Sequence, residues 1–161
     1  DRGGKSHYFC PRPEDLTSIR YSEASMNDEE EIKSSLTELI RLKTDRNLLN
    51  NQIHDLAAQL TILKLKGFHP QATFKYQGAG ISGIDIQGYL QGSLEIACEV
   101  STHDKYQGNR QTNINGDLNR LENCQTRCKY LSVVSEDIER SLKNSQSVHT
   151  KYPSVQIIRV L

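Results

Sequence analysis

The chain has 161 residues, a length that fits one domain of ordinary size. Its 20 Lys and Arg residues balance its 20 Asp and Glu residues, so net charge neither indicates nor excludes a nucleic-acid-binding protein. No stretch approaches the ~20 mostly apolar residues that a membrane-spanning helix needs, so we expect no membrane partner.

Residues 1–27 hold Gly3, Gly4, Pro11 and Pro13 among scattered polar residues, without periodicity. This composition is typical of irregular structure, and we expect an N-terminal arm or linker there. The chain begins with Asp and shows no leader of basic, apolar and small residues. We therefore expect it to be part of a longer protein, with the other domains of that protein among its partners.

Apolar residues recur at helical spacing directly after this segment, behind an acidic first turn that suits the helix dipole. They predict a helix over residues 28–43, within an accessory segment 28–45. A second helix is predicted over residues 46–66, at the start of a core domain spanning 46–161. Gly67 stands where a C-terminal cap is expected and ends the second helix.

Residues 39–63 also fit a heptad pattern, which suggests a coiled-coil homodimer. Its two core positions hold Leu39, Arg46, Ile53 and Leu60, and Leu42, Leu49, Leu56 and Leu63. Further apolar residues widen the stripe beyond a coiled-coil seam. Two helices in the core of the domain are therefore the favoured interpretation, and a dimerisation module is the alternative.

After the helices the period changes to two, which is the signature of strands. Strands are predicted at 72–77, 83–90 and 94–101, followed by a helix through Ile114, Leu118 and Leu121, a strand at 129–134, a helix from Ser135 and a strand at 155–161. This order predicts an α/β domain with a mixed sheet that helices cover on both faces.

The four cysteines lack the dense spacing of a secreted disulfide scaffold. We therefore expect a reducing, cytoplasmic location, with Cys98 as a buried thiol in a strand. Cys124 and Cys128 would lie one helical turn apart, but a zinc site needs four ligands and no second pair lies nearby. Two structural thiols are the favoured interpretation.

The hairpin over 83–101 can be given a register from its side chains. With Gln91-Gly92-Ser93 as a three-residue loop, Ile86 pairs with Cys98, Ile84 with Val100, and Asp85 with Glu99. This register places the aliphatic residues on one face and both carboxylates on the other. Directly opposed residues hold their Cβ atoms only ~4.5–5.5 Å apart.

Two carboxylates at this separation repel each other, and a divalent cation would remove the repulsion. Mg²⁺ is typically held by one or two carboxylates together with waters and phosphate oxygens. The alternative is a wet face on which Asp85 and Glu99 are solvated or paired with Lys75 and Lys105. The sequence thus predicts a Mg²⁺ or Mn²⁺ site on this hairpin or a solvated pair of acids.

The run GIDIQGYLQGSLEIACEVST at 83–102 resembles the core of the PD-(D/E)xK nuclease superfamily, which includes the restriction endonucleases. The resemblance implies a restriction-endonuclease-like fold with an N-terminal helical extension. It implies that Asp85, Glu99 and the carbonyl of Val100 hold the metal, and that Ser101 stands where the family carries a catalytic Lys.

Because Ser101 has no charge, Lys75 on the neighbouring strand or Lys105 in the following loop is expected to replace the lysine. Asp55 is the candidate for the acid that some members carry on the first helix. The resemblance also implies phosphate contacts from polar residues before the next helix: Gln107, Arg110 and Gln111.

The leading hypothesis is therefore a Mg²⁺-dependent endonuclease that hydrolyses DNA, as one domain of a larger defence, repair or mobile-element protein. The first alternative keeps the fold without the chemistry, as a nuclease-like module that binds nucleic acid or a protein. Ser101 and the mildly basic stretch at 105–129 favour that alternative. The second alternative is the coiled-coil dimerisation module at 39–63.

Overall fold

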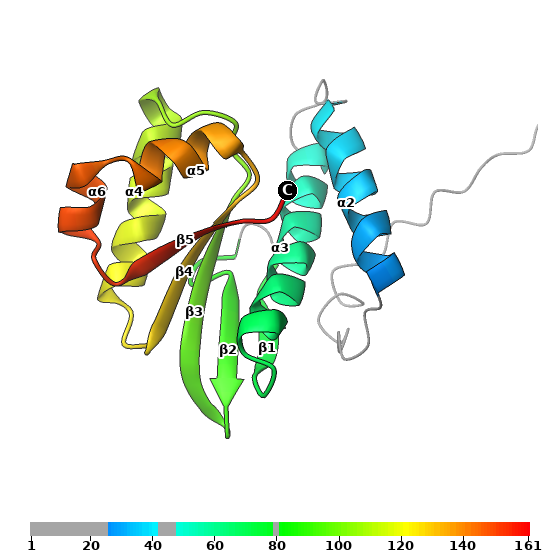
Figure 1. The fold of residues 1–161 in the computed structure, drawn as a ribbon, viewed down its shortest axis with the longest axis horizontal. Helices are drawn as coiled ribbons and strands as arrows, with labels where there is room; N and C mark the ends of the chain where they lie inside the picture. Colours follow the sequence, from blue (N-terminus) through cyan, green and yellow to red (C-terminus); the bar gives the residue numbers. More distant parts are fainter. Residues whose placement is uncertain (1–25, 42–47, 79–80) are drawn as a thin grey trace, which may run out of the picture.

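A computed structural model describes residues 26–41, 48–78 and 81–161 of the chain (Figure 1). The arm or linker expected at 1–27 lies outside these residues except for its last two. The described chain is a mixed α/β fold in which helices flank a five-stranded mixed sheet, so the predicted class is confirmed. No helix in the described part of the chain is long and apolar enough to cross a membrane.

The five strands lie in the sheet in the order in which they occur in the chain. They are β1 (Thr73–Tyr76), β2 (Ile86–Leu90), β3 (Ser93–Ser101), β4 (Cys128–Val133) and β5 (Val155–Arg159). The first three form an antiparallel meander, and β4 and β5 continue the sheet parallel to β3. All five strands were predicted, although β2 begins later than expected because the backbone at Gly83 takes a φ of 127°, outside the strand range.

Helices cover both faces of the sheet (Figure 1). The two parallel crossovers place α4 (Gly108–Asn123), α5 (Glu136–Lys143) and α6 (Gln146–Lys151) on one face. The short helix α6 was not predicted. Its N-cap residue is Ser145, whose side chain accepts a hydrogen bond from Val148 N. Ile114, Leu118 and Leu121 of α4 are fully buried against the sheet, as their spacing predicted.

The opposite face is covered by α3 (Leu48–Phe68), and α2 (Met26–Arg41) packs on the outside of α3 (Figure 1). The cap expected at Gly67 was wrong, because α3 continues to Phe68 and His69 N still donates to Leu65 O at 2.8 Å. The glycine is a helical residue here and not the left-handed residue that follows a helix.

The heptad residues of α3 belong to the core of this chain. Ile53 and Leu60 are 1% and 3% exposed, and Leu56 and Leu63 pack against the same core. The segment 42–47, with Leu42 and Arg46, and the side chain of Leu39 lie outside the described residues. The two core helices favoured by the wide apolar stripe are thus observed, and the homodimer stays a prediction.

Strand β3 lies at the centre of the sheet, and its alternation separates two cores. Ile96, Cys98 and Val100 face α3, and Ala97 and Glu99 face α4. A carboxylate in a strand buried on both faces is costly unless it is paired. The structure therefore has to provide a partner for Glu99.

The hairpin loop differs from the expected one. It has two residues, Gln91 and Gly92, both with positive φ as a tight hairpin turn requires, and Leu90 pairs with Ser93. A bulge between Gly88 and Tyr89 then shifts the register by one residue. The predicted pair of Ile86 with Cys98 is therefore correct although the predicted loop was wrong.

Gly88, next to the bulge, has no room for a side chain. A Cβ atom there would lie 2.8 Å from both Ile96 Cβ and Phe74 Cε1. The expected pairing of Ile84 with Val100 was wrong, since β2 begins at Ile86 and Ile84 packs on the α4 side.

Candidate functional site

Asp85 and Glu99 lie together at the end of β3, as the hairpin register predicted. Asp85 immediately precedes β2, and its Oδ2 accepts a hydrogen bond of 2.8 Å from Val100 N. This bond from the backbone of β3 holds the Asp85 carboxylate beside Glu99, with which it interacts directly. The pair is largely shielded from water, because the Glu99 side chain is 1% exposed and that of Asp85 is 16% exposed.

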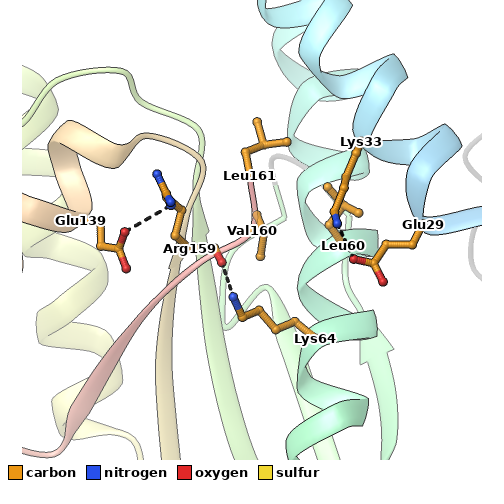
Figure 2. Close-up of a pocket in the computed structure, with 8 residues that line it drawn as sticks. All are labelled: Glu29, Lys33, Leu60, Lys64, Glu139, Arg159, Val160 and Leu161. Atoms are coloured by element: carbon orange, nitrogen blue, oxygen red, sulfur yellow. Dashed lines mark hydrogen bonds and ion pairs between the residues drawn. The ribbon is translucent and has the colours of Figure 1, made fainter. Parts of the chain in front are cut away.

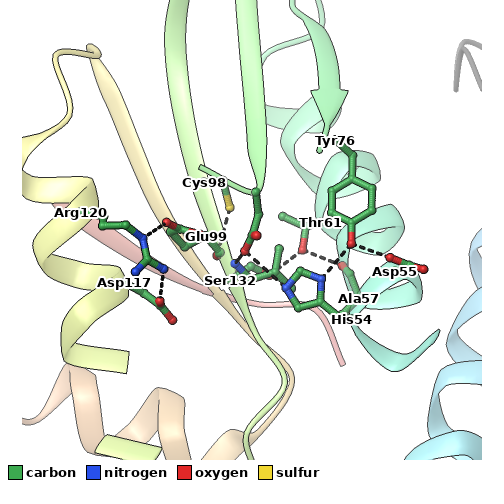
Figure 3. A network of polar contacts seen from close by, with 12 residues as sticks. His54, Asp55, Ala57, Thr61, Tyr76, Cys98, Glu99, Asp117, Arg120 and Ser132 are labelled. Atoms are coloured by element: carbon green, nitrogen blue, oxygen red, sulfur yellow. Dashed lines mark hydrogen bonds and ion pairs between the residues drawn. The ribbon is translucent and has the colours of Figure 1, made fainter. Parts of the chain in front are cut away.

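Arg120 of α4 is the partner of Glu99 (Figure 3). Its Nε donates to Glu99 Oε1 at 2.7 Å, and its Nη2 donates to Asp117 one turn earlier on α4. The arginine side chain is half exposed, so the guanidinium lies between a buried carboxylate and solvent. One cation thus serves two acids at the boundary of the core.

The two central carboxyl groups have opposite pKa shifts. Burial and the neighbouring charge of Asp85 raise the pKa of Glu99 to about 8, although Arg120 opposes the shift. Burial also acts to raise the pKa of Asp85, but the hydrogen bond and charge of His54 outweigh it and hold that pKa below its ordinary value. The direct contact of the two largely buried carboxyl groups thus opposes ionisation of both at once, and a further positive charge beside them would favour it.

His54 of α3 reaches Asp85 from the other face of the sheet. Its Nε2 lies 3.4 Å from Asp85 Oδ2, and its Nδ1 lies 2.8 Å from the Tyr76 hydroxyl. Tyr76 in turn donates to Asp55 at 2.6 Å (Figure 3). Burial acts to lower the pKa of His54, but Asp85 outweighs it and raises that pKa above its ordinary value.

Asp117 is a third acid in this region. Burial and the charge of Asp85 raise its pKa to about 6, against the effect of Arg120. We call these five side chains, His54, Asp85, Glu99, Asp117 and Arg120, the carboxylate site. Perturbed titrating groups gathered in this way are typical of functional sites, although buried ion-pair networks show them as well.

Ser101, which occupies the lysine position of the resemblance, is 3% exposed. It follows Glu99 by two residues on β3, so the two share a face of the sheet. Its Oγ has no hydrogen-bond partner within the described part of the chain. A buried hydroxyl in this state is costly and is suited to binding a water or a ligand oxygen.

Asp85 and Glu99 carry oxygen ligands of the kind that Mg²⁺ and Mn²⁺ take. Two adjacent carboxylates, one buried hydroxyl without a partner and the nearby His54 nitrogen are ligand or water-binding groups for such an ion. Within the described residues, no group of three or more His, Cys, Asp and Glu side chains is gathered closely enough to hold a metal by itself. Waters and substrate oxygens would therefore complete the shell around Asp85 and Glu99.

The lysines expected to replace the family lysine lie elsewhere. Lys75 is exposed, and its Nζ stands 5.1 Å from the centre of the Tyr89 ring. Lys105 is exposed in the loop between β3 and α4. The role predicted for them has no support in the contacts recorded for the described residues, and the cation observed at Glu99 is Arg120.

The other predicted residues surround the carboxylate site without joining it. Asp55, the candidate helix acid, is bound to Tyr76. Gln107 is the N-terminal cap residue of α4, Gln111 is exposed one turn later, and Arg110 pairs with Asp104. These three lie on the solvent side of the α4 N-terminus, where a phosphate would meet free backbone N–H groups.

Cys98, Cys124 and Cys128 are free thiols that lie on different elements of the fold. Cys98 is fully buried, which, together with the charges of Asp85 and Glu99, raises its pKa well above the ordinary value. Cys124 is the C-terminal cap residue of α4 and Cys128 begins β4, so the expected spacing of one helical turn was wrong.

A hollow of about 400 Å³ lies beside the carboxylate site, between the segment before β2 and the C-terminal half of α4. We call it the α4 cleft. Its lining residues are Gly83, Ile84, Asn119, Arg120, Asn123 and Cys124. Arg120 belongs to both the cleft and the carboxylate site, so the two are continuous.

A larger hollow of about 490 Å³ lies among α2, α3, α5 and the end of β5 (Figure 2). Charged side chains dominate its lining, but they are largely paired with one another. Lys33 pairs with Glu29 at 2.7 Å and Arg159 with Glu139 at 3.2 Å. Lys64 donates to Arg159 O. This hollow contains none of the predicted site residues.

Sequence reasoning missed the roles of His54, Asp117 and Arg120. His54 is next to the predicted helix acid Asp55 in the chain, and Arg120 lies within the mildly basic stretch 105–129, but neither position indicated a role at the hairpin. The available signal was the pairing of Asp117 and Arg120 three residues apart, next to the apolar stripe of α4. The same pattern is common on solvated helix surfaces, so it did not identify a site.

Comparison of the chain with models of protein families finds no match, and comparison with curated proteins finds none either.

Proposed function

We propose that the chain is a Mg²⁺- or Mn²⁺-dependent nuclease domain of the restriction-endonuclease-like type, acting on DNA. The observation that carries the proposal is the pair of Asp85 and Glu99, two largely buried carboxyl groups that interact directly at the end of β3. The mixed five-stranded sheet with helices on both faces is compatible with such a domain. The resemblance of residues 83–102 supports the same assignment.

The residues of the carboxylate site have separate tasks in this proposal. Asp85 and Glu99 hold the ion, and the bond from Val100 N keeps Asp85 oriented toward it. When bound, the ion neutralises phosphate charge and lowers the pKa of water. His54 stabilises the ionised form of Asp85, and Tyr76 fixes the imidazole ring.

The test is the variant Asp85→Asn, which keeps the size of the side chain and removes its charge. We expect it to retain binding to a DNA duplex and to lose Mg²⁺-dependent cleavage, because the ion has one carboxylate left. Asp137→Asn, which changes an exposed acid of α5, is the matched control and keeps full activity. Unchanged cleavage by Asp85→Asn would refute the proposal.

The second candidate is a nuclease-like module that binds nucleic acid or a protein without cutting. The observation that favours it is the engagement of Glu99 by Arg120, which already neutralises the carboxylate without a metal. In that case affinity for DNA falls steeply as salt rises, while no divalent ion produces cleavage. Isothermal titration of Mg²⁺ and Mn²⁺ separates the two candidates, because only the nuclease needs a bound ion.

A further inference from the structure

The α4 cleft opens directly beside the carboxylate site. One of its walls is the turn at Gly83 and Ile84, which leads into Asp85, and the other is the solvent side of Asn119, Arg120 and Asn123. Its volume of about 400 Å³ lies within the ~300–1,000 Å³ range of small-ligand pockets. A group bound in it would lie next to the ion-binding carboxylates.

Arg120 has hydrogen-bonding capacity to spare at the inner end of this cleft. A guanidinium carries five N–H groups, and the contacts recorded here use Nε for Glu99 and Nη2 for Asp117. Neither of these contacts uses Nη1. Because Arg120 is half exposed and lines the cleft, its remaining N–H groups can donate to a bound group while Nε keeps its bond to Glu99.

We propose that the α4 cleft receives the nucleotide next to the scissile phosphodiester, and that Arg120 contacts its phosphate in place of the lysine missing at Ser101. This inference rests on the nuclease function proposed above. In this proposal one strand of nucleic acid lies in the α4 cleft, and Arg120 of α4 is the cation that contacts it.

The lining combines apolar surface with a cation and two amides, a combination that suits a nucleotide. The half-exposed Arg120 attracts an anion, and an arginine fork matches the geometry of phosphate oxygens. The amides of Asn119 and Asn123 offer both donors and acceptors to a sugar or a base edge. Ile84 and Cys124 add a small apolar wall on which a base can rest.

The structure provides an internal reporter for this cleft. Cys124 lines it, while Cys128 is also half-buried but lies outside it at the start of β4. We would treat the protein with N-ethylmaleimide in EDTA, with and without a 20-nucleotide DNA strand, and measure modification of each cysteine by peptide mass spectrometry. Fluorescence anisotropy would report binding of the same strand independently.

The expected result is several-fold slower modification of Cys124 in the presence of DNA, with no change at Cys128. If the strand binds but Cys124 is not protected, the inference about the cleft is wrong while the nuclease function stands. If the strand and its duplex do not bind at all, with or without Mg²⁺, both are overturned.

Substitution of Arg120 tests its part separately. Arg120→Lys keeps one charge and is expected to retain part of the rate, whereas Arg120→Met is expected to lower kcat by about 100-fold with little change in Mg²⁺ affinity. Added guanidinium should restore part of the activity of the Met variant. If both variants fold and cut like the natural protein, Arg120 does not contact the phosphate.

Discussion

His54 and Asp85 approach each other from different elements, with 3.4 Å between Nε2 and Oδ2. Tyr76 donates its hydroxyl hydrogen to Asp55, so it accepts a hydrogen bond from His54 Nδ1. In the neutral ring the Nε2 lone pair therefore faces Asp85. An ion held by Asp85 would find an imidazole nitrogen beside it.

This arrangement predicts a preference among metals. Mn²⁺ accepts imidazole nitrogen more readily than Mg²⁺, which prefers oxygen ligands. We expect His54→Gln to weaken Mn²⁺ binding by about 10- to 100-fold and Mg²⁺ binding by less, as measured by calorimetric titration. His69→Gln is the matched control, because His69 pairs with the Tyr130 hydroxyl instead. Equal losses for the two metals would show that His54 acts only through the charge of Asp85.

The raised pKa of Glu99 predicts how stability varies with pH in the absence of metal. The carboxyl group ionises near 4.5 in the unfolded chain and near 8 in the folded chain. Between these values the folded state binds more protons, so the free energy of unfolding falls as pH rises. The pKa of Asp117 is also raised, to about 6, and adds to this decrease in the lower part of the pH range.

Thermal melts from pH 4.5 to 8 in EDTA measure this effect. We expect the melting temperature to fall across the range, and Glu99→Gln to flatten the curve because glutamine has no proton to lose. Added Mn²⁺ should raise the melting temperature more at pH 8 than at pH 5, since ion binding favours the deprotonated pair. A melting temperature that rises toward pH 8 without metal would contradict the assignment.

Gly88, beside the bulge in the β2–β3 hairpin, is closely packed by two side chains. Gly88→Ala would force a Cβ into contact with Ile96 and Phe74 at 2.8 Å, and overpacking of this kind costs about 1–3 kcal/mol of the free energy of unfolding. Gly67→Ala is the control, because nothing lies within 4 Å of an added Cβ in that helical position. It should be neutral or stabilising by up to about 1 kcal/mol. Urea denaturation measures both, and equal effects would show that the close approach at Gly88 is relieved.

Shortening a buried heptad residue of α3 should leave a cavity in the core of the domain. Ile53→Ala should lower the free energy of unfolding by about 2–5 kcal/mol, because Ile53 is buried within a single chain. Unfolding of the unaltered protein should not depend on its concentration. Sedimentation and urea denaturation at several concentrations check this, and a midpoint that rises with concentration would instead indicate the homodimer predicted through 39–63.

The amino-acid sequence by itself determined the order and type of the elements other than α6, and the meeting of Asp85 with Glu99. These are local properties, because side-chain period identifies strands and helices within a few residues. Pairing Ile86 with Cys98 also depends on the short hairpin alone, since a shift by one residue would expose the buried face. The predicted pair is correct although the predicted loop is one residue too long, because the bulge between Gly88 and Tyr89 shifts the register by one residue.

The tertiary structure alone decided which charged groups complete the carboxylate site. Arg120 follows Glu99 by 21 residues and His54 precedes Asp85 by 31, so no local period relates them. They meet because α3 and α4 pack on opposite faces of one sheet and each directs a polar side chain to the end of β3. The buried Glu99 in the central strand is paired with a cation from the packed helix α4, whereas the family resemblance had suggested a lysine on β3 or near it.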